Sequence, residues 1–456
     1  MNKNGLSRDL TEGNLWMQLL LFSLPFMASN ALQVLYSTID MIIVGHFVGT
    51  PGLSAVSQAS QVINFAAMVL LGFSNGGQVL IAQALGAGKR REMSEIIGTL
   101  FGFIAAIAVV LSAVLLIFTH PILTLLKVPV ESYDMAVDYL VISASGLIFT
   151  AGYNMISAVM RGMGDAKRPF IFIGIASAVN LVLDLLFTGL FGWGVAGAAW
   201  ATIIGQAVSL VFSFVYLYKR RESFGFDFSP SSFRPNMRYL GMMARLGVPM
   251  AIQSGFINIS MLFVNSMIND VGLVASATFG VGVRIDDIVN KISMGIQYAA
   301  MPMISQAIGA GKVERAKKTV WVAILYSLVL TLFFMLMYVL LGKQLFMIFS
   351  DDPLVHEMSS TFISAILFMF PAFTIMRGTG AFIQGIGNAK LGMVLSIMDG
   401  VLLRIGLSWL FGIYLGLGFW GFVFGYALAP YGYSIPSLIY FLFAKWQKKK
   451  TLANEI

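Results

Sequence analysis

Long apolar segments follow one another along this chain, and each is long enough to cross the hydrocarbon core of a lipid bilayer. A core of about 30 Å requires roughly 20 mainly apolar residues in an α-helix. The chain is 58% hydrophobic and only 11% charged, whereas soluble domains carry about 25% charged residues. We therefore predict an all-α integral membrane protein whose helices are solvated mainly by lipid.

Twelve such segments can be distinguished, and the sequence predicts one transmembrane helix for each. Because the polar start of the chain leads into an apolar segment much longer than that of a signal peptide, we expect no cleaved signal. The predicted spans are 15–45, 54–85, 94–118, 134–160, 169–190, 194–218, 240–268, 273–308, 314–342, 355–384, 389–415 and 418–446.

Short motifs occur twice at a constant separation. IAQALGAGKRRE starts at residue 81 and ISQAIGAGKVER at residue 304, with seven of twelve positions identical. RGMGDAK at 161–167 and QGIGNAK at 384–390 have the same spacing. A fixed interval indicates a duplicated unit, so we predict two pseudo-symmetric six-helix lobes. They would be 1–218 and 239–456, joined by a cytoplasmic linker at 219–238, and parallel because six spans return the chain to its starting side.

Lysine and arginine gather at both ends of the chain and in every second loop. Of the 29 basic residues, 23 lie there, two (Lys127 and Lys343) lie in the opposite loops, and four lie inside spans. Cytoplasmic loops carry the excess of Lys and Arg, so we predict cytoplasmic termini for a multi-pass protein of the inner (plasma) membrane. The 23 are Lys3, Arg8, Lys89, Arg90, Arg91, Arg161, Lys167, Arg168, Lys219, Arg220, Arg221, Arg234, Arg238, Arg245, Lys312, Arg315, Lys317, Lys318, Lys390, Lys445, Lys448, Lys449 and Lys450.

The glycine-rich GAGK stretch resembles a phosphate-binding loop only superficially. Lys89 is followed by Arg90, whereas a P-loop requires Ser or Thr there, after a strand. We interpret GAGK as a cytoplasmic turn in which glycine ends the preceding helix. No nucleotide-binding domain is recognisable, so we expect no use of ATP. The net charge of +8 lies in the inner loops and indicates no nucleic-acid partner.

Catalytic and metal signatures are also missing from the sequence. The chain has no cysteine and three well-separated histidines, which argues against thiol chemistry and against a His-rich or Cys-rich metal centre. We therefore predict that the protein is not an enzyme and has no resident cofactor.

Two acidic residues stand out deep inside spans of the first half, namely Asp40 and Asp184. A charged side chain at this depth costs about 2.5–3.5 kcal/mol on insertion scales and is a functional candidate by default. Asn180 lies one helical turn before Asp184, and Thr202 and Tyr139 fall at a similar depth in their own spans. Carboxylate, amide and hydroxyl oxygens suit a hard cation such as Na⁺. Alternatively, burial and mutual repulsion leave a proton on one carboxyl group, or the acids only hydrogen-bond within a polar seam.

The second half lacks this set and carries other charges. Span 8 contains Arg284, Asp286, Asp287 and Lys291, whose spacing allows opposite charges to pair along one helix. The simplest interpretation is an internally neutralised polar face, although their role stays open. Three further residues, Arg377, Asp399 and Arg404, either pair across spans or line a cleft.

Glycines are abundant in these spans and predict close helix contacts. Gly194, Gly197 and Gly205 occur around the start of span 6. A residue without a side chain allows two helix backbones to approach one another in a membrane. We expect these glycines to lie where span 6 packs against a neighbouring helix.

The motifs quoted so far resemble those of the multidrug and toxic compound extrusion (MATE) family along essentially the whole chain. The most specific are YSTIDMIIVGH at 36–46, NMISAVMRGMGDAK at 154–167, and NLVLDLLF followed by GVAGAAWAT. The resemblance implies two six-helix lobes in a V shape that export organic, often cationic compounds in exchange for H⁺ or Na⁺. Small organic molecules and the lipid bilayer would be its partners, and we expect a monomer.

The resemblance also implies roles for individual residues. Asp40, Asn180, Asp184 and Thr202 match the cation site of the DinF-like branch, and Pro25 matches the proline at which its first helix bends. The NorM-like branch uses acids in spans 7 and 10, where this chain has Gln253 and Gly378-Thr379. This departure favours coupling in the first lobe. Residues expected to line the substrate cleft are Gln33, Tyr36, Tyr139, Asn154 and Arg284.

Two alternatives stay open at this point. A flippase for a lipid-linked precursor shares this topology, but usually adds spans or lines its cleft with several basic residues. Arg284, Arg377 and Arg404 keep that possibility in view. A receptor or scaffold that transports nothing would have no need of acids inside its spans.

Overall fold

The computed structural model describes residues 9–221 and 226–448, and every regular element in those ranges is a helix. Lys3, Arg8, Lys449 and Lys450, which contribute to the charge pattern, lie outside the described residues, as does part of the predicted linker. By contacts the chain forms two compact units. The first unit contains Ala28–Ala251, and the second contains Leu10–Met27 together with Ile252–Glu455.

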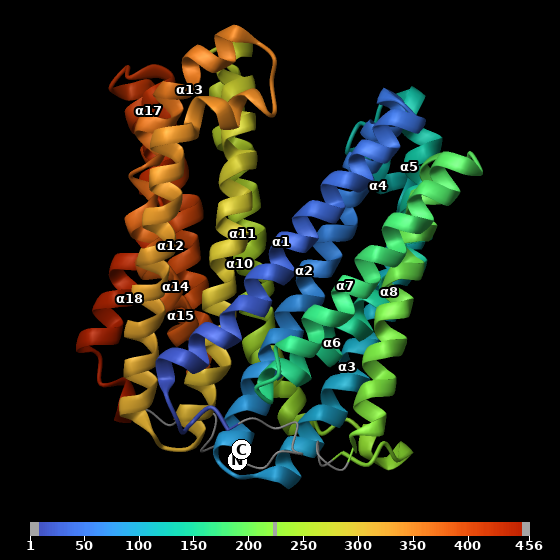
Figure 1. Cartoon of the computed structure of the whole chain (residues 1–456), viewed down its shortest axis with the longest axis vertical. Helices are drawn as coiled ribbons and strands as arrows, with labels where there is room; N and C mark the ends of the chain where they lie inside the picture. Colours follow the sequence, from blue (N-terminus) through green and yellow to red (C-terminus); the bar gives the residue numbers. More distant parts are fainter. Residues whose placement is uncertain (1–8, 222–225, 449–456) are drawn as a thin grey trace. The chain divides into compact units, whose positions relative to one another are not determined.

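The first half of the chain forms long helices that run side by side, drawn in blue to green in Figure 1. Within it α7 packs against α8, and α2 packs against α5 and α6. The elements are α1 Leu15–Phe47, α2 Thr50–Gly86, α3 Arg90–Ile117, α4 Thr119–Leu125, α5 Val130–Ser145, α6 Leu147–Gly162, α7 Lys167–Asp184, the π-helical η1 Leu185–Leu190, α8 Gly194–Lys219 and the short η2 Pro230–Phe233.

The second half repeats this arrangement, with α11 packed against α12 and α14. Its elements are α10 Met237–Asn269, α11 Leu273–Gly309, α12 Val313–Met347, α13 Pro353–Ile366, α14 Met369–Gly385, α15 Ala389–Ile397, η3 Met398–Ile405, α16 Gly406–Trp409, η4 Leu410–Tyr414, α17 Gly418–Leu428, α18 Tyr431–Phe443 and η5 Trp446–Lys448. Both η3 and η4 are π-helical.

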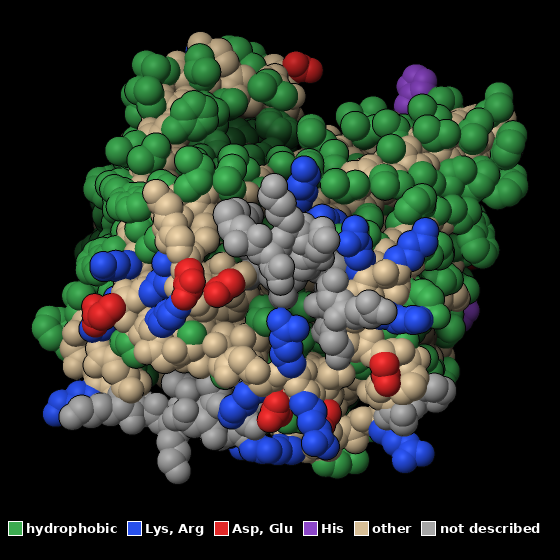
Figure 2. Space-filling model, turned by 60° about the horizontal axis from the view of Figure 1, so that its bottom comes forward, with side chains coloured by type: hydrophobic (Ala, Val, Ile, Leu, Met, Phe, Trp, Pro, Cys, Tyr) green, Lys and Arg blue, Asp and Glu red, His purple; other side chains and the backbone are tan. Residues whose placement is uncertain are grey.

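Each of the twelve predicted spans corresponds to one helix or to a run of consecutive helical segments. Within the described residues, eight helices are long and apolar enough to cross a membrane. The pairs α5–α6 and α13–α14, bent by 45° and 49°, bring the number to ten. The other two predicted spans are α11, which carries several charged residues, and α17–α18, which is interrupted at Pro430. In Figure 2 hydrophobic side chains cover the upper part of the surface, and most visible lysine and arginine side chains gather over its middle and lower part.

The GAGK motifs form the predicted helix-ending turns in both halves. Gly88 and Gly311 have φ of 72° and 70°, a conformation that favours glycine. The following lysine amides donate back to the helix, Lys89 to the Ala84 carbonyl at 3.0 Å and Lys312 to the Ala307 carbonyl at 2.8 Å. These bonds satisfy carbonyl groups that a helix leaves without partners at its C-terminus. The prediction of a turn is confirmed.

Two helices contribute to both units. Residues of α1 up to Met27 group with the second unit and those from Ala28 with the first, whereas α10 changes unit between Ala251 and Ile252. Each change lies two residues after a proline within the helix, Pro25 or Pro249. The contacts thus divide the chain differently from the predicted lobes 1–218 and 239–456. The reason is that those boundaries follow the repeat, whereas contacts also depend on where each helix half packs.

The segment before α1 is held by the second unit through its own carbonyl groups. Arg315 of α12 donates to the carbonyl of Leu10 at 2.9 Å and to that of Glu12 at 2.8 Å. Lys312 donates to the Thr11 hydroxyl at 3.0 Å and pairs with Glu12 at 3.0 Å. The residues that follow α11 therefore bind the segment that leads into α1, a role that the sequence did not predict.

Candidate functional site

The site begins with the close packing of α7 on α8. A Cβ atom at Gly205 would lie 2.9 Å from the Ala176 carbonyl oxygen, and one at Gly197 would lie 2.9 Å from the carbonyl carbon of Phe187. Both glycines therefore permit the backbones to touch, as predicted. The prediction is wrong for Gly194, which has φ of 60° and open space beyond its Cα, so it serves the turn before α8 instead.

This close approach brings Asn180 of α7 against Thr202 of α8. The Asn180 amide donates a hydrogen bond to the Thr202 hydroxyl at 3.3 Å. Asp184 is the last residue of α7, one helical turn beyond Asn180, and its side chain is almost completely buried. Both oxygens of this carboxyl group are buried, and neither accepts an N–H or O–H hydrogen bond of regular geometry in the described part of the chain.

Asp40 reaches the same place from α1. It is also buried, and its carboxyl group lies within hydrogen-bonding reach of that of Asp184. A hydrogen bond between two carboxyl groups requires a proton on one of them, because an ionised carboxylate can only accept. No lysine or arginine forms an ion pair with either acid among the residues that the structure describes.

Two tyrosines complete the surroundings of the acids. Tyr36, one turn before Asp40 on α1, and Tyr139 of α5 are both close enough to interact electrostatically with Asp40. The Tyr139 hydroxyl accepts a hydrogen bond from Ser60 at 3.3 Å. We call Tyr36, Asp40, Tyr139, Asn180, Asp184 and Thr202 the acid cluster. All six belong to the first unit.

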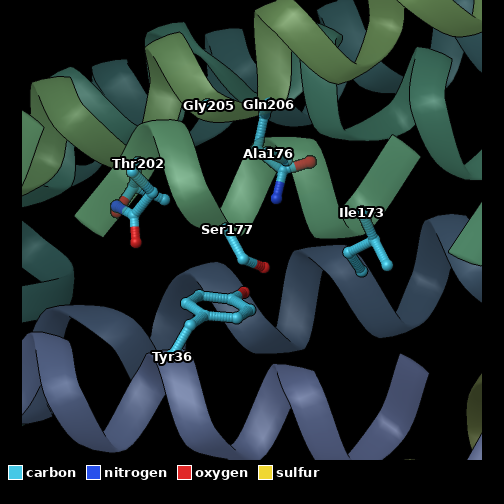
Figure 3. Close-up of a pocket in the computed structure, with 8 residues that line it drawn as sticks. Tyr36, Ile173, Ala176, Ser177, Thr202, Gly205 and Gln206 are labelled. Carbon is cyan, nitrogen blue, oxygen red and sulfur yellow. The ribbon is translucent and has the colours of Figure 1, made fainter. Parts of the chain in front are cut away.

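A small cavity of about 10 Å³ adjoins the acid cluster (Figure 3). A cavity of this volume has room for about one water molecule. Tyr36, Asn180 and Thr202 line it, and the hydroxyl groups of Tyr36 and Ser177 point toward one another in Figure 3. The remaining lining residues are Ile173, Ala176, Ser177, Gly205 and Gln206.

Sequence reasoning did not identify Ser177 and Gln206 as site residues. Ser177 precedes Asn180 by three positions and Gln206 follows Thr202 by four, so each shares a helix face with a predicted residue. The Ser177 hydroxyl and the side-chain amide oxygen of Gln206 are buried and have no hydrogen-bond partner within the described ranges. Their spacing of three or four residues from a predicted site residue could have identified them from the sequence.

The acid cluster can hold one small positive charge. Two buried carboxyl groups without a basic partner strongly disfavour a doubly ionised state. A proton shared between them relieves the repulsion, and a monovalent cation held by carboxylate, amide and hydroxyl oxygens does the same. A group of three or more His, Cys, Asp or Glu side chains that could hold a metal does not occur among the described residues.

Other predicted site residues are not part of the acid cluster. Gln33 and Arg284 are exposed, and Asn154 of α6 is half-buried. Pro25 lies inside α1, in the part that groups with the second unit. Their roles in lining a cleft or bending a helix stay predictions.

The charges of the second unit separate into surface and buried groups. Lys291 pairs with Asp287 at 2.7 Å on the half-exposed side of α11, in agreement with a neutralised polar face. Asp286 departs from that expectation, because it is buried and accepts a hydrogen bond from Tyr426 at 3.2 Å. Arg404 pairs with Asp399 at 2.9 Å, and both are buried.

Comparison with known proteins gives consistent matches over the whole chain. It is 28% identical to the probable multidrug resistance protein YpnP of Bacillus subtilis, covering 98% of this chain and 99% of that protein. It is 27% identical to the probable multidrug resistance protein NorM of Thermotoga maritima, covering 96% and 94%. The fold matches an outward-facing multidrug resistance MATE family transporter of the MOP superfamily with a TM-score of 0.92 and 22% identity, over 99% of this chain and 100% of that one.

The family itself is identified by its sequence model. The MatE family model matches residues 25–186 and residues 249–410, once in each half, and the two matches together cover more than half of the chain. This protein therefore belongs to the MatE family of membrane transporters.

Proposed function

We propose that this transporter is an ion-coupled multidrug exporter, which expels organic and often cationic compounds in exchange for H⁺ or Na⁺. The observation that carries the proposal is the pair of buried acids, Asp40 and Asp184, within hydrogen-bonding reach and without a basic partner. Such a pair has a high affinity for one positive charge when buried and a low affinity when hydrated. An ion gradient can therefore drive a change in its burial.

Coupling follows if the two states of the acid cluster differ in shape. With both carboxylates ionised, repulsion and solvation favour a hydrated pocket between α1, α7 and α8. Loading of H⁺ or Na⁺ from the outer side lets that pocket dry and close. The first helix then bends at Pro25, where a backbone hydrogen bond is already missing. Drug and ion need not touch, but their affinities are reciprocally reduced.

Several finer features accompany this proposal. The four residues Asp40, Asn180, Asp184 and Thr202 support assignment to the DinF-like branch, with coupling in the first lobe. The distribution of lysine and arginine supports cytoplasmic termini in the inner (plasma) membrane. The substrates would enter a cleft lined by residues such as Gln33 and Asn154, and the transporter would act as a monomer.

The flippase alternative receives less support from the side-chain partners. A lipid-linked pyrophosphate needs accessible basic residues. Arg404 is buried in an ion pair with Asp399, and Arg377 is buried and donates to Asn290 and Gln297. Of the three arginines that kept the alternative open, Arg284 is the exposed one.

The test is a competition measurement on the purified protein with ethidium as the probe cation. Ethidium affinity is measured at several pH values and Na⁺ concentrations for the wild type, Asp40→Asn and the control Asp138→Asn. Asp138 is an exposed neighbour of Tyr139 on α5. We expect H⁺ or Na⁺ to weaken binding to the wild type and the control, and to lose most of this effect in Asp40→Asn.

Two results would contradict the proposal. Neither ion weakens ethidium binding to the wild type, or Asp40→Asn keeps the full ion dependence. Efflux from proteoliposomes under an imposed gradient then distinguishes an exporter from a flippase and from a receptor. An exporter moves the dye, a flippase moves labelled lipid instead, and a receptor moves neither.

A further inference from the structure

We propose that Asp286 of the second unit is a further proton-binding site, and that its protonation determines which partner Arg377 holds. Asp286 lies on α11 and Arg377 on α14, two helices that pack against one another in the second unit (Figure 1). This site is separate from the acid cluster, and the inference does not depend on coupling there.

Asp286 is a buried acid without an ion pair. It is only 3% exposed, one of its oxygens accepts from the Tyr426 hydroxyl at 3.2 Å, and the other has no partner within the described residues. An isolated buried carboxylate costs several kcal/mol, which a single hydrogen bond from a neutral hydroxyl does not offset. As its surroundings stand, the carboxyl group is more stable with a proton.

Both nearby arginines are held by other groups. Arg404 forms an ion pair with Asp399 at 2.9 Å and lies over the Tyr426 ring, 5.0 Å from its centroid. Arg377 donates to the side-chain oxygen of Asn290 and, at 3.5 Å, to that of Gln297. Its Nε has no partner in the described part of the chain. Its guanidinium also lies over the Phe373 ring, 4.9 Å from the centroid. Arg377 is thus a buried cation whose contacts in the described part of the chain are with neutral groups.

The groups that face Asp286 come from four elements besides its own. They are Tyr426 of α17, Arg404 of η3, Arg377 of α14 and Tyr338 of α12, with Asp287 adjacent on α11. The helices α10 and α13 contribute apolar side chains to the surrounding core. Asp286 is therefore the buried carboxyl group in this set that forms no ion pair with a residue that the structure describes.

The geometry of α11 provides a second partner for Arg377. Asn290 lies four residues after Asp286, which places the two side chains one turn apart on one face, with Cβ atoms about 5–6 Å from each other. A change of side-chain rotamer can therefore transfer the guanidinium from Asn290 to Asp286. Loss of the proton to water leaves a carboxylate, and Arg377 then exchanges its bond to Asn290 for an ion pair with Asp286. Protonation reverses both steps.

The two units hold their buried acids in different surroundings. In the first unit, Asp40 and Asp184 form no ion pair with lysine or arginine among the described residues. In the second unit, Arg404 forms an ion pair with Asp399, which leaves Asp286 as a buried acid without such a pair within the described ranges.

Infrared spectroscopy of the purified protein tests the proposal directly. The C=O band of protonated carboxyl groups is followed as pH is raised, in a background with Asp40→Asn and Asp184→Asn so that the acid cluster does not contribute. We expect a band that decreases with pH, that is missing in Asp286→Asn, and that persists in Asp287→Asn. Asp287 is the matched control, because it is adjacent but ion-paired with Lys291.

A second variant keeps Asp286 and tests the exchange. Arg377→Gln removes the cation that would stabilise the ionised carboxylate, so the band should persist to higher pH than in the background protein. Two outcomes overturn the proposal. The spectra of Asp286→Asn and its background superimpose at every pH, or Arg377→Gln leaves the titration of the Asp286 band unchanged. If Asp286→Asn does not fold, the Arg377→Gln titration decides alone.

Discussion

Asp184 shows how one residue acquires a function from its position at a helix end. It is the last residue of α7, and the chain continues into the π-helical segment η1. Wide π-helical turns occur frequently at functional sites, and here the change in helix type follows the carboxyl group that meets Asp40. The side chain is kept in a buried position despite its cost, which is the usual sign of a functional acid in a membrane.

Replacing Asp184 should therefore abolish export without preventing insertion. Asp184→Asn preserves the size of the side chain but removes the charge whose neutralisation would drive the conformational change. We expect ethidium efflux from proteoliposomes to fall to background, while expression and detergent stability stay at wild-type levels. Asp138→Asn is the control for an exposed acid. Wild-type efflux by Asp184→Asn under the same gradient would show that this carboxyl group is not the coupling residue.

Gly205 determines how closely α8 approaches the acid cluster. A Cβ atom there would lie 2.9 Å from the Ala176 carbonyl oxygen and 3.2 Å from the Asn180 Cβ. Gly205→Ala should push α7 and α8 apart and lengthen the bond between Asn180 and Thr202. Overpacking of this kind costs about 1–3 kcal/mol, so we expect a lower thermal midpoint in detergent together with impaired efflux.

The matched control for this change is Gly174→Ala on α7. At that position the nearest atom to a new Cβ is Leu32 Cδ2 at 3.8 Å, an ordinary contact. The control should keep the midpoint and the efflux of the wild type. Equal effects of the two substitutions would mean that helix propensity, rather than contact between α7 and α8, governs the result.

At the scale of elements, α1 and α10 are the helices that belong to both units. The part of α1 before Ala28 groups with the second unit, and the part that carries Asp40 groups with the first. The start of α1 is fixed by Lys312 and Arg315, next to the second GAGK turn. The helix that carries Asp40 therefore belongs to the second unit at its other end.

Removing Arg315 should loosen that attachment. Arg315→Ala deletes donors to the carbonyl groups of Leu10, Glu12 and Gly13. Each hydrogen bond from a charged group is worth about 1.5–3 kcal/mol. We expect faster amide hydrogen exchange over residues 10–18, measured by mass spectrometry, with little change elsewhere. Lys317→Ala is the control, since Lys317 pairs only with the exposed Glu314 among the partners that the structure gives it. Unchanged exchange in Arg315→Ala would rule out this anchoring role.

For the whole molecule, the distribution of charge predicts the orientation in the membrane. The chain has no cysteine, so single substitutions can be labelled without background. Arg91→Cys and Lys318→Cys, near the starts of α3 and α12, should stay unlabelled when intact cells are treated with a membrane-impermeant maleimide. Lys343→Cys, near the C-terminal end of α12, should react. All three positions are exposed. Labelling at Arg91 or Lys318 from outside would reverse the predicted topology.

The sequence by itself determined the class of protein, its all-helical character and the repeat. A composition with so few charges cannot form a soluble surface, and an apolar run long enough to cross lipid must satisfy its backbone hydrogen bonds within a helix. The helix-ending turns were also predictable, because the left-handed conformation at Gly88 and Gly311 is a local property of glycine.

Only the tertiary structure decided which predicted residues meet. Periodicity gives the depth and the face of a residue on its own helix, but not the rotation of that helix against its neighbours. Asp40 and Gln33 share a face by their spacing, yet Asp40 is buried beside Asp184 and Gln33 is exposed. The two adjacent acids of α11 separate in the same way, Asp287 to a surface ion pair and Asp286 to a buried site. Packing of one helix on another is a long-range property, and a local pattern of residues does not contain it.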